Sequence, residues 1–88
     1  MSDAQEWTVY YHMRRKEYKV EKLDYQEEGW TRKSRVGFSQ AQARVLAIGM
    51  AYNRKWVRQA KLKRYIRVDL SGPTIKIIET RIRIHEGG

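Results

Sequence analysis

Hydrophobic and polar residues alternate in three segments before residue 39, a pattern that is typical of half-buried β-strands. The predicted strands are residues 6–13, 17–25 and 30–38. The parity of the alternation changes within the second segment, so we expect either a bulge near Glu21 or apolar cover on both faces of the strand. Three consecutive strands with short connections predict an antiparallel meander.

One long helix is predicted from about Gln40 to Lys61. Ser39 and Gln42 have the spacing of a capping box, in which each side chain accepts a hydrogen bond from the other residue's backbone N–H. The most apolar stripe of the helix has the width of a face that packs on a core, and we expect it to face the sheet. This predicted stripe consists of Ala41, Val45, Ile48, Gly49, Tyr52 and Trp56.

Two other sectors complete the helix surface. A small sheet cannot cover a second apolar sector as well, so we interpret Leu46, Met50 and Val57 as a possible homodimer seam, or as a surface covered by the N-terminal strand or the tail. The remaining sector is basic and is interrupted only by the small residues Ala47 and Ala51. Its cations are Arg44, Arg54, Lys55, Arg58 and Lys61.

Two more alternating segments follow the helix, Arg64–Leu70 and Ile75–His85, with a Ser-Gly-Pro-Thr turn between them. The parity of the last segment changes at Ile77–Ile78, which predicts a bulge or a strong twist. The order of elements is therefore β-β-β-α-β-β.

This order predicts an α+β fold in which an antiparallel sheet carries one long helix on one face. Residues 1–88 are expected to form a single small domain, with flexible tails at 1–5 and 86–88. The face of the sheet without a helix is then either solvated or a binding surface.

The net charge of the chain indicates which class of partner it binds. The chain has 19 Lys and Arg against 10 Asp and Glu, a net charge of +9, and no acid occurs between Glu28 and Asp69. Solubilising surfaces normally mix both signs, so a long stretch with one sign favours a polyanionic partner. The leading hypothesis is a small basic nucleic-acid-binding protein, with DNA favoured over RNA, of a phage or mobile-element type.

Two binding surfaces are possible on this hypothesis. The first is the open sheet face, where Tyr10 and Tyr65 are candidates for base stacking between rows of cations. The candidate cations of this face are Lys33, Arg35, Arg67, Arg81 and Arg83. The second is the basic sector of the helix. If six to ten phosphates are neutralised, affinity falls by roughly 10³–10⁵ between 50 and 200 mM salt.

The segments Gly29-Trp30-Thr31-Arg32-Lys33 and Gly37-Phe38-Ser39-Gln40 resemble the three-strand-plus-helix domains of plant AP2-type factors. They are also similar to the N-terminal arm-binding domains of phage and transposon integrases. The resemblance covers about a third of the chain and implies that Thr31, Lys33 and Arg35 enter the DNA major groove. The chain departs from both families in its leading strand and its C-terminal hairpin, so the resemblance is an architectural hint.

Other functional classes have little support. There is no cysteine, the two histidines are far apart, and no glycine-rich phosphate loop occurs, so we expect no enzyme activity, no metal and no cofactor. No segment is long and apolar enough for a membrane span or a secretory signal, which favours a cytoplasmic protein. The alternative function is an inhibitor or adaptor module that uses its positive surface to bind an acidic or nucleic-acid-handling protein.

Overall fold

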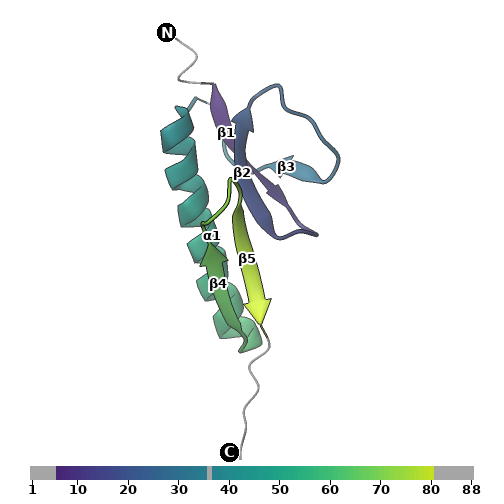
Figure 1. The fold of residues 1–88 in the computed structure, drawn as a ribbon, viewed down its shortest axis with the longest axis vertical. Coiled ribbons are helices and arrows are strands. Elements are labelled where there is room, and N and C mark those ends of the chain that lie inside the picture. The colour runs from purple at the N-terminus through teal and green to yellow at the C-terminus, as the bar shows by residue number, and fades with distance from the viewer. Residues whose placement is uncertain (1–5, 36, 81–88) are drawn as a thin grey trace, which may run out of the picture.

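The structure of the chain is a computed structural model that describes residues 6–35 and 37–80. These residues form a five-stranded antiparallel sheet with one helix packed against it (Figure 1), which confirms the predicted α+β class. The elements are β1 (Trp7–His12), β2 (Glu17–Lys22), β3 (Trp30–Arg32), α1 (Gln40–Leu62), β4 (Tyr65–Asp69) and β5 (Ile75–Thr80).

The sheet has the strand order β3-β1-β2-β5-β4 and consists of two blocks. β1 pairs with β2 along its whole length, and β4 pairs with β5 along its whole length. Among the described residues the two blocks are joined where Glu17 faces Lys76 and Tyr18 faces Ile75, and the Ile77 amide donates to the Lys16 carbonyl beside this short ladder. α1 runs along both blocks, with β1 and β2 beside its first half and β4 and β5 beside its second half (Figure 1). The helix therefore holds together two blocks that share a short ladder.

The strand registers correct four expectations. β3 pairs with β1 and not with β2, so the first three strands do not form the predicted meander. The β1–β2 ladder is regular from Trp7 to His12, so β2 contains no bulge near Glu21, and the residues that change parity lie beyond its end at Lys22. The β4–β5 ladder is also regular, and Ile78 simply lies on the face opposite Ile77. β3 is shorter than predicted, and Phe38 forms an isolated bridge with Trp7. Of the predicted last strand, residues 81–85 lie outside the described residues.

Local signals define both ends of α1. The Gln42 amide donates to Ser39 Oγ over 3.1 Å and the Ser39 amide donates to Gln42 Oε1 over 3.0 Å, which confirms the capping box. At the other end Lys63 has a left-handed backbone with φ of 55°, and its amide donates to the Gln59 carbonyl over 2.9 Å. Within the described part of the chain, no helix has the length and hydropathy to cross a bilayer.

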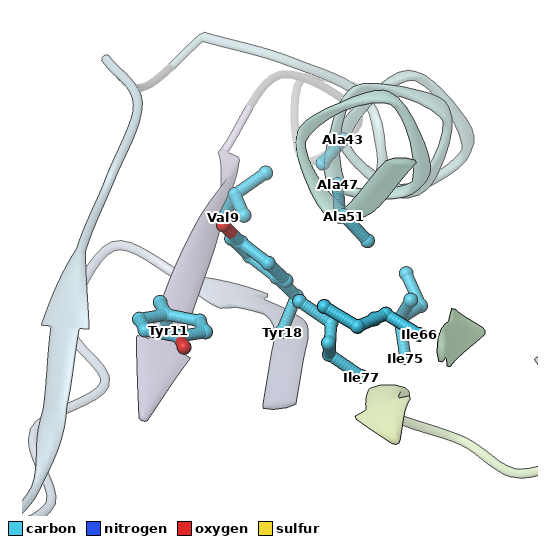
Figure 2. Packing of buried hydrophobic residues seen from close by; sticks show 9 residues of the cluster. All are labelled: Val9, Tyr11, Tyr18, Ala43, Ala47, Ala51, Ile66, Ile75 and Ile77. Atoms are coloured by element: carbon cyan, nitrogen blue, oxygen red, sulfur yellow. The ribbon is translucent and has the colours of Figure 1, made fainter. Parts of the chain in front are cut away.

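The core lies between α1 and one face of the sheet, and the helix contributes only Ala43, Ala47 and Ala51 to its fully buried part (Figure 2). The sheet supplies the bulk of this core through Val9, Tyr11, Tyr18, Ile66, Ile75 and Ile77. Because these large side chains fill the layer, only small helix residues fit against them at close-packed density.

The predicted core stripe of the helix is therefore wrong. Val45 is 70% exposed and Trp56 is 61% exposed, and both lie on the side of α1 that faces away from the sheet. Ile48 alone among the larger members also packs partly against the core. The most hydrophobic stripe of the helix is on the outside because the sheet leaves room for alanine and not for tryptophan.

Candidate functional site

The sheet-facing line of α1 changes character halfway along the helix. Its first half consists of Ala43, Ala47 and Ala51, which are fully buried. The same line continues at helical spacing through three cations on the sheet side of the helix, of which the first two are partly buried and the third is exposed. These cations are Arg54, Arg58 and Lys61.

Arg54 is held over the aromatic residues of the first sheet block. Its Nε donates a hydrogen bond to the Tyr18 hydroxyl over 3.2 Å, and its guanidinium carbon lies 4.5 Å from the centre of the Tyr11 ring. Partial burial acts to lower the pKa of Arg54, but the Tyr18 hydroxyl and the neighbouring charges outweigh it, so the pKa is raised. Burial also raises the pKa of Tyr11, against the effect of the Arg54 charge. Arg54 is thus a fixed positive charge.

Arg58 is held by Glu79 of β5. The Arg58 Nε lies 2.6 Å from Glu79 Oε2, and an Arg64 terminal nitrogen lies 3.6 Å from Glu79 Oε1. The hydrogen bond from Arg58 lowers the pKa of Glu79 despite the opposing effect of burial, and Lys16 and Arg64 lower it further. Glu79 is only 10% exposed and is ionised at neutral pH. One carboxylate thus anchors a cluster of cations without neutralising it.

A groove of about 370 Å³ opens along these side chains, beside the junction of the two sheet blocks. Its lining consists of Tyr18, Met50, Asn53, Arg54, Val57, Arg58 and Lys61. We call this the basic groove. Arg54 and Arg58 each use Nε for their hydrogen bond within the protein, which leaves their two terminal nitrogens for a ligand. The groove therefore combines preorganised cations with apolar walls.

The other basic residues predicted on the helix lie elsewhere. Arg44 and Lys55 lie to one side of the alanine line, and Lys55 stands 5.6 Å from the centre of the Tyr52 ring. The predicted basic sector is consequently divided between the groove and one flank of the helix.

The predicted dimer seam is also divided. Leu46 and Met50 pack against the protein's own core, so they need no second protomer, while Val57 is exposed.

The predicted sheet-face site is not assembled within residues 6–35 and 37–80. Lys33 and Arg35 follow β3 at one edge of the sheet, whereas Arg67 and the exposed Tyr65 lie on β4 at the other edge. Arg81 and Arg83 fall outside the described residues. The cations that are described are therefore separated by the width of the sheet.

Tyr10 is not available for base stacking, because its ring is buried under the loop between β2 and β3. Its edge packs on Tyr25 with 5.1 Å between ring centres, and its hydroxyl lies 3.3 Å from the Lys22 and Leu23 carbonyl oxygens. Lys19 adds to this cover, with its ammonium group 4.2 Å from the Tyr25 ring and 4.4 Å from the Trp30 ring. The loop thus fills the part of the open face where a stacking site was predicted.

The pattern of the sequence missed Tyr18, Glu79 and Lys16 as parts of the site. Glu79 is 21 residues from Arg58 in sequence, so no local spacing reports their contact. One signal was present: alanines at 43, 47 and 51 mark a line of close approach, and the cations at 54, 58 and 61 extend it. Reading the small residues as the buried face would have placed Arg54, Arg58 and Lys61 beside the sheet.

Comparison with known proteins adds no relative, because no protein-family model, curated protein or solved structure matches the chain. Among the described residues, no three histidine or acidic side chains come together as a metal site. The basic groove is therefore the feature of the described residues that best indicates a function.

Proposed function

We propose that the protein binds the phosphate backbone of nucleic acid in the basic groove. The observation that supports this most directly is the convergence of Arg54, Arg58 and Lys61 on one groove, beside which Glu79 is already paired with Arg58. Lys16 and Arg64 lie close enough to Glu79 to lower its pKa, so they add positive charge at the same end of the molecule.

The arginines suit phosphate in their geometry as well as their charge. A guanidinium group presents forked N–H donors that match two oxygens of a phosphate. Because Tyr18 and Glu79 hold the Nε atoms of Arg54 and Arg58, less side-chain entropy is lost when an anion binds. Met50 and Val57 lower the local polarity, which strengthens a charged hydrogen bond.

We assign the cations of the groove to phosphate contacts and not to base readout. The hydrogen-bonding residues of the groove are cations together with Asn53 and Tyr18, and Tyr18 is already engaged with Arg54. Contacts to phosphate position a nucleic acid but carry no sequence information directly. We therefore expect binding to duplex DNA, the favoured polymer, with little sequence preference and a strong dependence on salt.

An acidic protein segment is the second candidate ligand. The specific observation in its favour is that Met50 and Val57 lie among the cations of the groove. Apolar side chains between cations suit a helix that alternates carboxylates with apolar residues. A glutamate-rich amphipathic peptide is the corresponding probe.

The test is fluorescence anisotropy of labelled 20-mers of duplex DNA, single-stranded DNA and duplex RNA at about 50 and 200 mM salt. Three to five phosphate contacts predict that duplex affinity falls by about 40- to 500-fold between these salts. This is less than the fall predicted for six to ten contacts, because the groove gathers only part of the basic residues. Absence of binding to all three probes at the lower salt, together with binding of the acidic peptide, would contradict the proposal.

A further inference from the structure

The face of α1 opposite the sheet is apolar, and of its larger residues only Ile48, at its edge, packs partly against the core of the described residues. Figure 1 shows the sheet on one side of the helix only. The outer face carries the stripe defined above, Ala41, Val45, Ile48, Gly49, Tyr52 and Trp56, which we now call the outer stripe. It contains no charge, although the chain has a net charge of +9. An exposed Trp in such a stripe is typical of an interface.

We propose that the outer stripe binds a second copy of the chain, with the two α1 helices antiparallel across a twofold axis between Ile48 and Gly49. Within one stripe the two large aromatic residues lie toward the C-terminal end, and Ala41 and Val45 lie toward the N-terminal end. A twofold interface brings each patch onto its own copy, so a patch of this kind must be self-complementary.

The antiparallel arrangement meets this requirement in every layer of the interface, where a layer is a pair of residues that lie opposite each other. Trp56 lies opposite Ala41 of the second copy, and Tyr52 lies opposite Val45 of the second copy. At the centre Ile48 lies opposite Gly49. At about 100° per residue, the two members of each layer lie on opposite sides of the centre line of the outer stripe, so that their side chains interdigitate and do not collide. In every layer, the larger side chain of one copy lies opposite the smaller side chain of the other copy.

A parallel pair of helices does not have this property. It places Trp56 against Trp56 at one end and Ala41 against Ala41 at the other, so the contact is crowded at one end and hollow at the other. Voids and overpacking both cost stability in an interface as they do in a core. The order of residue sizes along the stripe therefore selects the antiparallel arrangement.

The area of the stripe indicates a weak dimer. From Ala41 to Trp56 the helix extends about 22 Å, and one half of the surface of a cylinder about 11 Å wide is on the order of 400 Å² over that length. Two copies then bury about 800 Å², which is below the size of a stable interface and is typical of a transient one. Exposed Trp56 and Val45 are the dominant contacts. We expect association in the micromolar range.

Charge makes the salt dependence of association informative. In the antiparallel pair Arg44 comes near Lys55 of the second copy along one edge of the seam, while Gln42 and Asn53 line the other edge. Salt screens this repulsion, so self-association becomes stronger as salt increases. Nucleic-acid binding in the basic groove has the opposite dependence. The groove lies on the sheet side of α1, so both grooves of a dimer stay open.

Sedimentation velocity at protein concentrations from about 1 µM to 1 mM, at low and high salt, tests the proposal. The expected result is a rise from the monomer mass of 10.6 kDa toward twice that value, at lower concentration in higher salt. A chain that stays at the monomer mass across the whole range would overturn the proposal. Its failure leaves the groove untouched, because the two tests use different faces of the helix.

A size swap tests the antiparallel arrangement itself. Trp56→Ala leaves two hollow layers and Ala41→Trp creates two crowded ones, so each change is expected to weaken association at least tenfold. The double variant Ala41→Trp/Trp56→Ala restores one large and one small residue in every layer and should recover most of the affinity. Leu62→Ala, at an exposed residue outside both the stripe and the basic groove, is the control and should leave the affinity of self-association within twofold.

The double variant distinguishes two outcomes. Recovery of self-association in the double variant supports the antiparallel contact between outer stripes. Equal loss in the double variant and in Trp56→Ala shows that Trp56 acts without a partner at Ala41, and it would overturn the arrangement. Circular dichroism of each variant confirms that the helix is intact.

Discussion

The two halves of the sheet-facing line of α1 differ in the side chains that they place against the sheet. The first half meets β1 and β2, whose Val9, Tyr11 and Tyr18 already fill the space, and it uses alanine for close approach. The second half passes the junction of the two sheet blocks, where the ladder between β2 and β5 is short, and it uses Arg54, Arg58 and Lys61. The helix therefore has small side chains where large sheet side chains fill the core, and it has cationic side chains where the groove opens between helix and sheet.

This comparison explains how a basic helix face can be both structural and available. The alkyl parts of long cationic side chains cover apolar surface, while the charged ends stay in water. Arg54 and Arg58 each make one hydrogen bond with the sheet and keep further donors. Charge repulsion between them is reduced by Glu79 and by the polarisable ring of Tyr11.

The largest effect is expected from filling the alanine half. Ala47→Leu adds three carbons at a fully buried position, so overpacking should lower the free energy of unfolding by about 1–3 kcal/mol. Urea unfolding followed by circular dichroism measures this. Ala60→Leu makes the same change at an exposed position of the same helix and should stay within about 0.5 kcal/mol. Equal effects at the two positions would mean that α1 is rotated differently.

An intermediate effect is expected from acid. The pKa of Glu79 is lower in the folded chain than its ordinary value of 4.5, so its contribution to stability is complete above that pH and is lost as the pH falls further. Glu79→Gln should make the decline of the unfolding free energy between about pH 5 and 2 shallower than in the wild type. Urea unfolding across this range measures it.

Glu28→Gln, in the exposed loop before β3, is the control for the acid experiment. Asp69, whose pKa is lowered by hydrogen bonds from the Ser71 hydroxyl and amide, titrates in both variants and does not affect their difference. An identical acid dependence in Glu79→Gln and Glu28→Gln would show that the pair with Arg58 does not stabilise the fold.

The smallest effect is expected from the hydroxyl of Tyr18. Tyr18→Phe keeps the buried ring and removes the acceptor that fixes the Arg54 Nε, so DNA affinity should fall by about threefold and stability by about 1 kcal/mol. Tyr65→Phe, at an exposed ring on β4, is the control for both measurements. A Tyr18→Phe variant that binds as tightly as the wild type would remove Tyr18 from the site.

The sequence predicted those parts of the fold that local patterns control. Alternation predicted five strands in the right order along the chain, and Ser39 and Gln42 predicted the start of the helix, because these signals depend on neighbours in sequence. Alternation did not predict the order of the strands in the sheet. The rotation of α1 was missed, because it depends on the sizes of side chains on the sheet and not on helix hydrophobicity. Assigning the buried face by hydrophobicity placed Trp56 inside.

The candidate site was predicted in part for the same reason. Arg54, Arg58 and Lys61 were identified from their position on one helix sector. Tyr18 and Glu79, which position two of them, are contacts across the chain that no spacing reveals. Tyr10 was predicted to be exposed because alternation assigns a face but does not show that a loop covers it.

The most direct test of the central claim compares two charge-matched variants by duplex DNA anisotropy. Arg54→Gln/Lys61→Gln removes two cations from the groove, and Arg44→Gln/Lys55→Gln removes two from the flank of the same helix. We predict that the groove variant binds at least tenfold more weakly at about 50 mM salt and has a salt slope smaller by about two. The flank variant should lose no more than about threefold and keep the wild-type slope. Equal losses in the two variants, or a greater loss in the flank variant, would contradict the assignment of binding to the basic groove.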